Sequence, residues 1–289
     1  MGLYKDITEK FIMKNAWEDW ASYREKLTQI IMDLKPTDII IVGGGRCNDI
    51  DLGLLAANAD TIKIIDVDKN GMNQAVNSLS DKLREKVDTS CLSLTGIEEG
   101  DMEEFFESML IYSRTQARAM TNEGFKDFLM KELDILSDKL IRNEEDLIGR
   151  IAGHANLGGK GKGNSVLVCS GLHSQLFSPL SFFIRSLLFS LKDIIPGTDQ
   201  IEAYVHKYIH NMNNQVIPII NSAFLKLAGH KIIFANEYME ESPVEGALQC
   251  INDVRARFDP KEMHLLWDFN PAQGVSYDML IQLVDLKHI

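Results

Sequence analysis

The chain has 289 residues, of which 45% are hydrophobic, so it can bury the core of one large domain or of one domain with an insertion. Its net charge of -12, without a basic block, would repel a phosphate backbone, which disfavours a nucleic-acid partner. No segment approaches the roughly 18 uninterrupted apolar residues of a membrane span, and charges interrupt the N-terminal segment where a signal peptide would be apolar. We therefore expect a cytoplasmic globular protein that acts on a small molecule or a peptide, not on nucleic acid or a membrane.

The cysteine and histidine patterns predict no metal site. The cysteines are widely spaced and form no CxxC pair, so neither a zinc knuckle nor a disulfide framework is indicated. His206 and His210 would share one face of a helix, but Lys207 stands where a zinc protease would carry its glutamate. An ordinary, partly exposed helix face explains this pair better.

The N-terminal segment is helical in pattern. Apolar residues recur at roughly helical spacing over residues 8–34, and Pro36 ends the pattern before the first strand. We expect one or two helices in residues 1–36, followed by an α/β domain over residues 37–289.

That domain opens with its most informative segment, residues 39–66. An apolar strand runs into Gly43, Gly44 and Gly45, a helix opens near Asp49, and a second strand ends at Asp66. Glycines let the backbone pass close to a ligand, and an acid about 20 residues further on suits a ribose diol. The alternative is a purely structural role for both features, in which the glycine turn serves only close packing and the aspartate only caps the next turn.

The following pattern predicts a doubly wound sheet with an insertion. Residues 71–86 indicate a helix and residues 87–94 a third strand, which continues the strand and helix alternation. Helical spacing then persists over residues 101–147, and residues 153–163 hold five glycines and two lysines. We interpret residues of about 100–163 as a helical insertion that acts as a lid. The glycine-rich stretch is not a Walker loop, because each Gly-Lys pair is followed by glycine.

The second half resumes the alternation and closes on a hairpin. Strands are indicated at 165–169 and 231–236, and helices at 179–194, at 199–228 with a kink near Pro218, and at 243–257. The runs at 264–269 and 277–286 could pair as an antiparallel hairpin.

This succession resembles the S-adenosylmethionine-dependent methyltransferases with a seven-stranded Rossmann-like sheet. Residues 39–49 look like the glycine motif of that family, Asp66 matches its ribose-binding acid, and residues 165–173 are similar to its fourth strand and the following loop. The terminal pair looks like the hairpin that closes the family's sheet, which simple dinucleotide folds lack. The resemblance implies an α/β fold with a doubly wound, mostly parallel sheet. The chain departs from the motif at Cys47, its third glycine position, and it fails the dinucleotide fingerprint because Asn48 occupies the third glycine there.

The resemblance also implies the residues that bind S-adenosylmethionine. Asp66 would hold the ribose, and Asp49 could reach the cofactor's amino group, whereas Asp51 is expected to cap the helix. Thr95 and Gly96 would edge the adenine, although a simple turn into the insertion explains them equally well. The implied cofactor-binding set is Gly43, Gly44, Gly45, Asp49, Asp66, Val67, Thr95, Gly96, Ser170 and Gly171.

His173 is the candidate catalytic base. A histidine at the carboxyl end of a central strand opens on the crevice where α/β proteins bind ligands, and it titrates near neutral pH. The alternative is a structural histidine bonded to a nearby carbonyl group.

The sequence therefore predicts a methyltransferase for a small molecule or peptide, with two rivals. One is an aminopropyltransferase similar to spermidine synthase, whose family places an aspartate at the end of the fourth strand, where this chain has Cys169 and Ser170. The other is a binding protein that keeps the fold without catalysis. The sequence leaves the acceptor atom and the oligomeric state open, a homodimer included.

Overall fold

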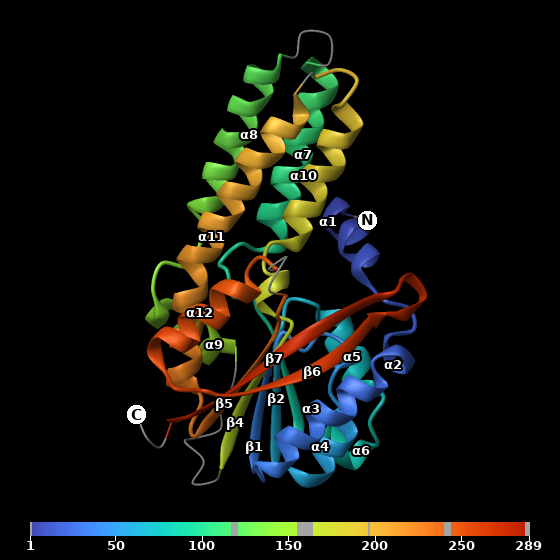
Figure 1. Cartoon of the computed structure of the whole chain (residues 1–289), viewed down its shortest axis with the longest axis vertical. Coiled ribbons are helices and arrows are strands. Elements are labelled where there is room, and N and C mark those ends of the chain that lie inside the picture. The colour runs from blue at the N-terminus through green and yellow to red at the C-terminus, as the bar shows by residue number, and fades with distance from the viewer. Residues whose placement is uncertain (1, 117–120, 155–163, 196, 240–243, 287–289) are drawn as a thin grey trace. The chain divides into compact units, whose positions relative to one another are not determined.

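The computed structural model describes residues 2–116, 121–154, 164–195, 197–239 and 244–286 (Figure 1). These residues form two compact units. The helical unit comprises Met1–Met13, Leu94–Arg142 and Gln175–Val216, and the sheet unit comprises Lys14–Ser93, Asn143–Ser174 and Ile217–Ile289. The segments expected as N-terminal helices (1–36) and as an insertion (100–163) are thus each divided between the two units. Residues 117–120 and 155–163 of the expected lid lie outside the described residues.

The sheet unit is an α/β fold built on seven strands in the order β3-β2-β1-β4-β5-β7-β6. The first five of these pair in parallel, and β7 is antiparallel to both β5 and β6, so the sheet is mixed (Figure 1). The predicted strands and the terminal hairpin are confirmed. Their bounds are β1 Asp38–Val42, β2 Thr61–Asp66, β3 Val87–Cys91, β4 Ser165–Ser170, β5 Lys231–Glu237, β6 Lys261–Asn270 and β7 Val275–Asp285.

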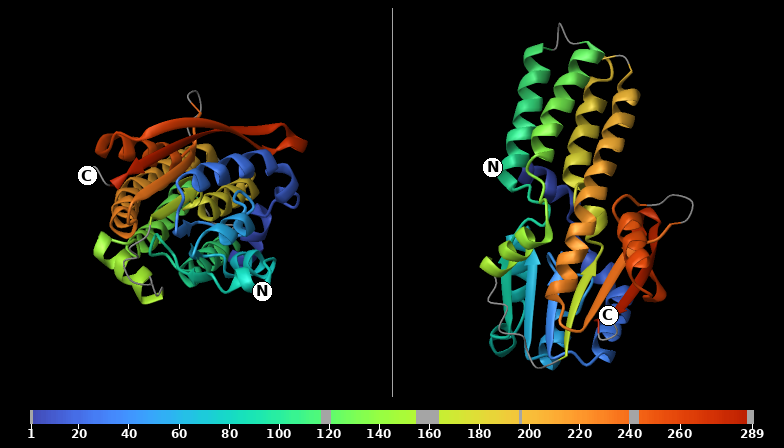
Figure 2. Two further views of the ribbon diagram at one scale, coloured as in Figure 1. Left: turned by 90° about the horizontal axis from the view of Figure 1, so that it is seen from below. Right: turned by 90° about the vertical axis from the view of Figure 1, so that its left-hand side faces the viewer.

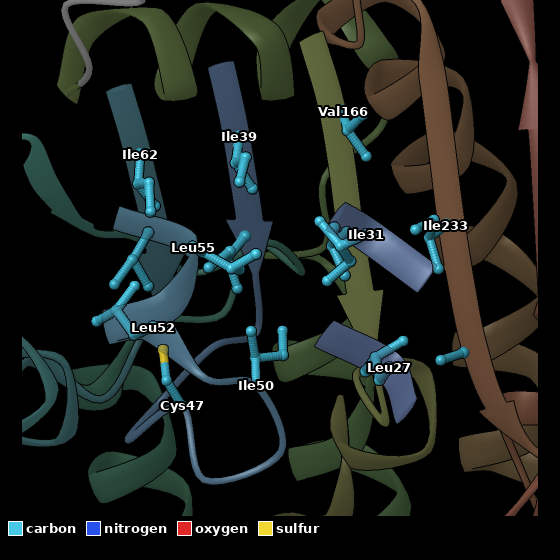
Figure 3. Close-up of a cluster of buried hydrophobic side chains, with 14 of the residues drawn as sticks. Leu27, Ile31, Ile39, Cys47, Ile50, Leu52, Leu55, Ile62, Val166 and Ile233 are labelled. Carbon is cyan, nitrogen blue, oxygen red and sulfur yellow. The ribbon is translucent and has the colours of Figure 1, made fainter. Parts of the chain in front are cut away.

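Helices cover both faces of this sheet. On one face lie α2 Ala16–Asp19, α3 Ala21–Asp33, α4 Leu52–Asn58, α5 Lys69–Asn77 and α6 Asp81–Arg84, and the remaining elements of the unit are α9 Glu144–His154, η2 His173–Gln175, α12 Ala247–Arg257 and η3 Pro271–Gln273. The first face holds the core shown in Figure 3, where Leu27 and Ile31 of α3 meet Ile39 of β1 and Val166 of β4. Each isoleucine or leucine fully buried there contributes about 1.5 to 3 kcal/mol to folding. The core therefore fixes which face of each strand is apolar.

One predicted helix is wrong in its extent. Residues 71–86 form two helices, α5 and α6, with a break at residues 78–80. The hydroxyl of Ser78 donates to the carbonyl oxygen of Ala75 at 2.7 Å, and Arg84 donates to the carbonyl oxygen of Leu79 at 3.0 Å. Side chains that satisfy backbone carbonyls locally compete with helix continuation, which the apolar spacing alone does not reveal.

The helical unit consists of α1 Leu3–Thr8, η1 Glu9–Phe11, α7 Glu99–Gln116, α8 Asn122–Ser137, α10 Ser178–Leu191 and the first part of α11 Thr198–Leu227. The long helices run alongside one another (Figure 2). Phe106 of α7 stacks on Phe183 of α10 with ring centroids 4.1 Å apart, and Tyr112 of α7 stacks on Phe128 of α8 at 3.9 Å. Helical spacing over residues 101–147 and 179–228 thus predicted these helices correctly, and α11 passes from this unit into the sheet unit next to Pro218.

The start of α12 yields a stability prediction. Gly246 has φ +82°, and a Cβ atom there would overlap the carbonyl oxygen of His173. Gly246→Ala should therefore lower the free energy of unfolding by more than about 2 kcal/mol, because both backbone strain and overlap must be relieved. Gly149→Ala is the matched control, since nothing lies within 4 Å of its Cβ position in α9. It should raise stability by about 0.5 to 1 kcal/mol. Equal urea midpoints for the two variants would contradict the close approach.

Candidate functional site

Three of the four central parallel strands, β2, β4 and β5, end in polar residues on the face covered by α3. The register aligns Ile64, Ile41, Val168 and Ile233 across β2, β1, β4 and β5. Because side chains alternate along a strand, the aligned face continues to Asp66, Ser170 and Glu237 at the strand ends. The carboxyl ends of parallel strands share one edge, and the strand order reverses between β1 and β4, which is where open α/β sheets bind ligands. The fold therefore brings these three side chains to the expected place for a ligand.

The three glycines of the loop after β1 have different surroundings. A Cβ atom on Gly43 would lie 2.7 Å from the Leu172 side chain, and one on Gly44 would lie 2.9 Å from methyl groups of Ile41 and Ile64. These two glycines therefore allow close packing, which is the purely structural role considered from the sequence. Gly45 differs, since with φ +45° its Cβ position meets only one atom within 4 Å, the Oδ2 of Asp66 at 3.8 Å. Gly45 is the glycine of this loop that faces open space.

Cys47 occupies the third glycine position and still adopts a glycine-like backbone. Its φ is +54°, and its N–H donates to the carbonyl oxygen of Gly44 at 2.6 Å, which closes a tight turn. Its side chain is buried, and burial raises the pKa of the thiol. The loop therefore keeps the left-handed course that a glycine would allow, at a strain of about 1 to 3 kcal/mol.

Asp66 is fixed by the backbone on both of its oxygens. Its Oδ2 accepts from the N–H of Gly45 at 2.8 Å and its Oδ1 from the N–H of Asp68 at 2.7 Å. The cap of α5 is Asp68, whose Oδ1 accepts from Gly71 at 2.8 Å. Burial raises the pKa of Asp66, and these hydrogen bonds oppose the shift. The backbone of Val67 contributes more weakly in the same direction as these hydrogen bonds, and because a carboxylate offers about four acceptor positions, Asp66 keeps acceptor capacity for a ligand.

Asp49 is a second carboxyl group at this edge. It is partly buried and bonds to Ser170, and burial raises its pKa to about 6 against the opposing effects of Ser170 and Arg24. The Arg24 guanidinium donates instead to the carbonyl oxygens of Trp17 and Asn48, at 2.7 and 2.9 Å. Arg24 therefore acts on Asp49 through its charge and not through a direct ion pair. Asp51 caps α4 as expected, accepting from Leu54 at 2.9 Å.

Tyr23 was missed at the sequence level. It is 1% exposed, its hydroxyl lies 3.1 Å from the Ser170 hydroxyl, and its ring stacks on Trp267 with centroids 5.0 Å apart. Burial, and next the charge of Asp49, raise the pKa of Tyr23 well above its usual range. No local motif marks Tyr23, because it comes from α3 and reaches the site only through packing.

The sequence places Glu237 after the fifth strand, where it could face substrate, but does not rank it above ordinary loop residues, although a signal for it exists. It ends β5 in the same phase as Ile233 and Ala235, as Asp66 follows Ile62 and Ile64 in β2. Glu237 is 7% exposed, and its Oε1 accepts from the Ser174 hydroxyl at 2.8 Å. Its Oε2 is buried and accepts no hydrogen bond from any residue that the structure describes. Burial raises the pKa of Glu237.

His173 lies on the opposite face of the sheet. It is 1% exposed, its Nε2 lies 3.0 Å from Asn221 Oδ1, and its ring packs on Phe234, which points away from Ala235 and Glu237. Burial lowers its pKa to about 4, so the ring is neutral at pH 7. This geometry favours the structural interpretation of His173 over the catalytic one, with a side-chain amide as partner in place of the expected carbonyl.

The other predicted residues divide between the units. In the sheet unit, the N–H of Gly171 donates to the carbonyl oxygen of Ala235 at 2.8 Å and so extends the pairing of β4 with β5. Val67 directly follows Asp66 and is 54% exposed. Thr95 and Gly96 belong to the helical unit. There the carbonyl oxygen of Thr95 accepts from Ile141 at 2.8 Å, and Gly96, with φ +92°, faces the backbone between α8 and α9. Their observed contacts are those of a turn.

No group of three or more His, Cys, Asp or Glu side chains within the described ranges is arranged to hold a metal ion. Within the same ranges, every helix is too short or too polar to cross a membrane.

Comparisons with known proteins add little. No family model and no curated protein matches the chain. Among solved structures, the chain is similar to the methyltransferase domain of bacterial CtHen1-CN, with 9% identity and a TM-score of 0.38 over 92% of this chain and 100% of that one. The function proposed below therefore rests on the sheet topology and the residues of the site.

Asp49 generates a prediction for the free protein. Its folded pKa of about 6 exceeds the ordinary 3.8, so the stability it contributes below about pH 4 is lost as the pH rises through 6. Asp49→Asn should therefore raise the free energy of unfolding at pH 7.5 by about 1 to 3 kcal/mol and leave it nearly unchanged at pH 4. Asp51→Asn, which preserves the cap of α4, should change little at either pH. Urea midpoints at the two pH values measure both effects, and a loss of stability in Asp49→Asn at pH 7.5 would contradict the burial argument.

Proposed function

We propose that the protein is an S-adenosylmethionine-dependent methyltransferase that acts on a small molecule or a peptide. The observation that carries the proposal is the pairing of Asp66 with Gly45. A carboxylate with free acceptor positions is held at 2.8 Å beside the one glycine of the loop that faces open space, at the switch point of the sheet.

The topology supports the same choice. Five parallel strands continue into a terminal hairpin with β7 inserted antiparallel between β5 and β6. This is the arrangement implied by the resemblance to the seven-stranded methyltransferases, and simple dinucleotide folds lack the hairpin. It weighs against NAD as the ligand.

The residues present fit the cofactor. Asp66 would hold the ribose, because a carboxylate with remaining acceptor capacity can accept hydrogen bonds from the hydroxyls of a diol. Gly45 would allow the cofactor to approach the backbone. Asp49 would face the positive charge of the cofactor's amino group, since burial raises its pKa to about 6 and Arg24 makes no direct ion pair with it.

Bound S-adenosylmethionine supplies a methyl group on a sulfonium, and the sulfur keeps the bonding electron pair when the acceptor takes the methyl group. The chain needs to orient the two partners and exclude water, and few catalytic residues are obligatory for this. Tyr23 and Ser170 hold Asp49 in place through a chain of side-chain hydrogen bonds. We assign no proton transfer to His173, because it packs on the other face of the sheet.

The rivals receive less support. An aminopropyltransferase would need an aspartate at the end of β4, where Cys169 is buried and Ser170 bonds to Tyr23. A binding protein without catalysis has the same site geometry, and only product formation distinguishes it from the enzyme.

Replacing Asp66 tests the proposal. Asp66→Ala should weaken S-adenosylmethionine binding about 10- to 100-fold, through the loss of charged hydrogen bonds to the ribose. Asp68→Ala is the matched control, because Asp68 accepts a backbone hydrogen bond in the same turn. It should cost about 1 kcal/mol of stability as a lost helix cap while leaving the affinity unchanged. Calorimetric titration of both folded variants decides the point, and unchanged affinity in Asp66→Ala would remove the ribose assignment.

A further inference from the structure

We propose that Glu237 is the anchor for the methyl-accepting substrate, and that the group it binds is a protonated amine. This inference rests on the proposed function, since it names the substrate class of the same site. It begins from the position of Glu237, which ends β5 two residues beyond Ala235, the register partner of Ser170. Glu237 thus lies on the same face and edge as the residues proposed to hold the cofactor, displaced by one strand from β4.

The carboxylate of Glu237 is buried but receives fewer hydrogen bonds than its two oxygens can accept. The Ser174 hydroxyl lies 2.8 Å from Oε1 but also 3.1 Å from the carbonyl oxygen of Gly171, and it has a single proton to share between them. Oε2 is buried and has no hydrogen-bond partner among the described residues. A buried acceptor without a donor is costly, more so when it is charged. The site therefore lacks an N–H or O–H group that a ligand could supply.

The charge of that ligand follows from the surroundings. Burial raises the pKa of Glu237, and the opposing contributions come from its backbone and the Ser174 hydroxyl, not from a basic side chain of the described chain. Asp49 and Asp66 add two further carboxyl groups at the same edge. A neutral donor would satisfy the hydrogen bond but leave the excess negative charge, whereas a cation satisfies both. No described cluster of ligands suits a metal ion, so an organic cation fits better.

Aromatic rings favour an ammonium group in particular. Glu237 pairs with Met279 across β5 and β7, so Tyr277, two residues away in β7, lies on the same face. Burial, and next the negative charge of Glu237, raise the pKa of Tyr277. Tyr277 is only partly buried. Glu237, with Tyr277 on the same face, would offer an ion pair and a cation–π contact to the same group, whereas the ring of Tyr23 is buried against Trp267.

The test compares two probes that differ in charge. Butylamine, protonated at pH 7.5, and butan-1-ol are titrated into the wild-type protein and Glu237→Gln by calorimetry, with and without S-adenosylmethionine. We expect the wild type to bind the amine at least about tenfold more tightly than the alcohol, a difference of 1.4 kcal/mol, and the variant to lose this preference. Its S-adenosylmethionine affinity should stay within about twofold of the wild type, because Glu237 does not hold the cofactor.

Each outcome has one meaning. Equal binding of amine and alcohol by the wild type overturns the inference without any variant. Retained amine preference in Glu237→Gln also overturns it, and a parallel loss of cofactor affinity would assign Glu237 to the cofactor's own amino group instead. Amine binding that depends on Glu237 supports the site even if S-adenosylmethionine does not bind, a result that would contradict only the proposed function.

Discussion

The structure of the site depends on the burial of carboxyl groups without matching cations. Asp49, Asp66 and Glu237 gather at the carboxyl edge of one sheet, and burial raises the pKa of each. Backbone N–H groups and hydroxyls partly compensate them, but no basic side chain in the described chain pairs closely with any of the three. A fold accepts such an arrangement at a cost in stability, and the common reason is function.

The rest of the sheet unit makes this burial possible. In β2, β4 and β5, side chains alternate between the two faces, so two apolar residues precede the terminal polar residue on the same face of each strand. Helix α3 covers that apolar face (Figure 3). Tyr23 of α3 then adds a polar end to an otherwise apolar helix face, where its hydroxyl meets Ser170. The same packing that builds the core therefore also orients the site, so that changes in α3 would affect both.

Local patterns in the sequence predicted the fold well, and the site only in part. The strands, the glycine loop, Asp66 and the terminal hairpin follow from apolar runs, glycines and an acid at a fixed interval, all of which are local signals. Tyr23 could not be found in this way, because it reaches Ser170 through a contact 147 residues apart in sequence. Glu237 could have been found from its phase in β5. His173, in contrast, was predicted as a site residue but lies on the other face of the sheet. The loop that follows a strand does not reveal from the sequence which face its side chains occupy.

The most direct test is calorimetric titration of the intact protein with S-adenosylmethionine, with NAD and decarboxylated S-adenosylmethionine as parallel ligands. The account predicts micromolar binding of S-adenosylmethionine and no binding of NAD, because it assigns Asp66 and Gly45 to the ribose of that cofactor in a sheet that ends in an antiparallel hairpin. Preference for decarboxylated S-adenosylmethionine would indicate an aminopropyltransferase. Binding of NAD alone, or of none of the three, would contradict the account.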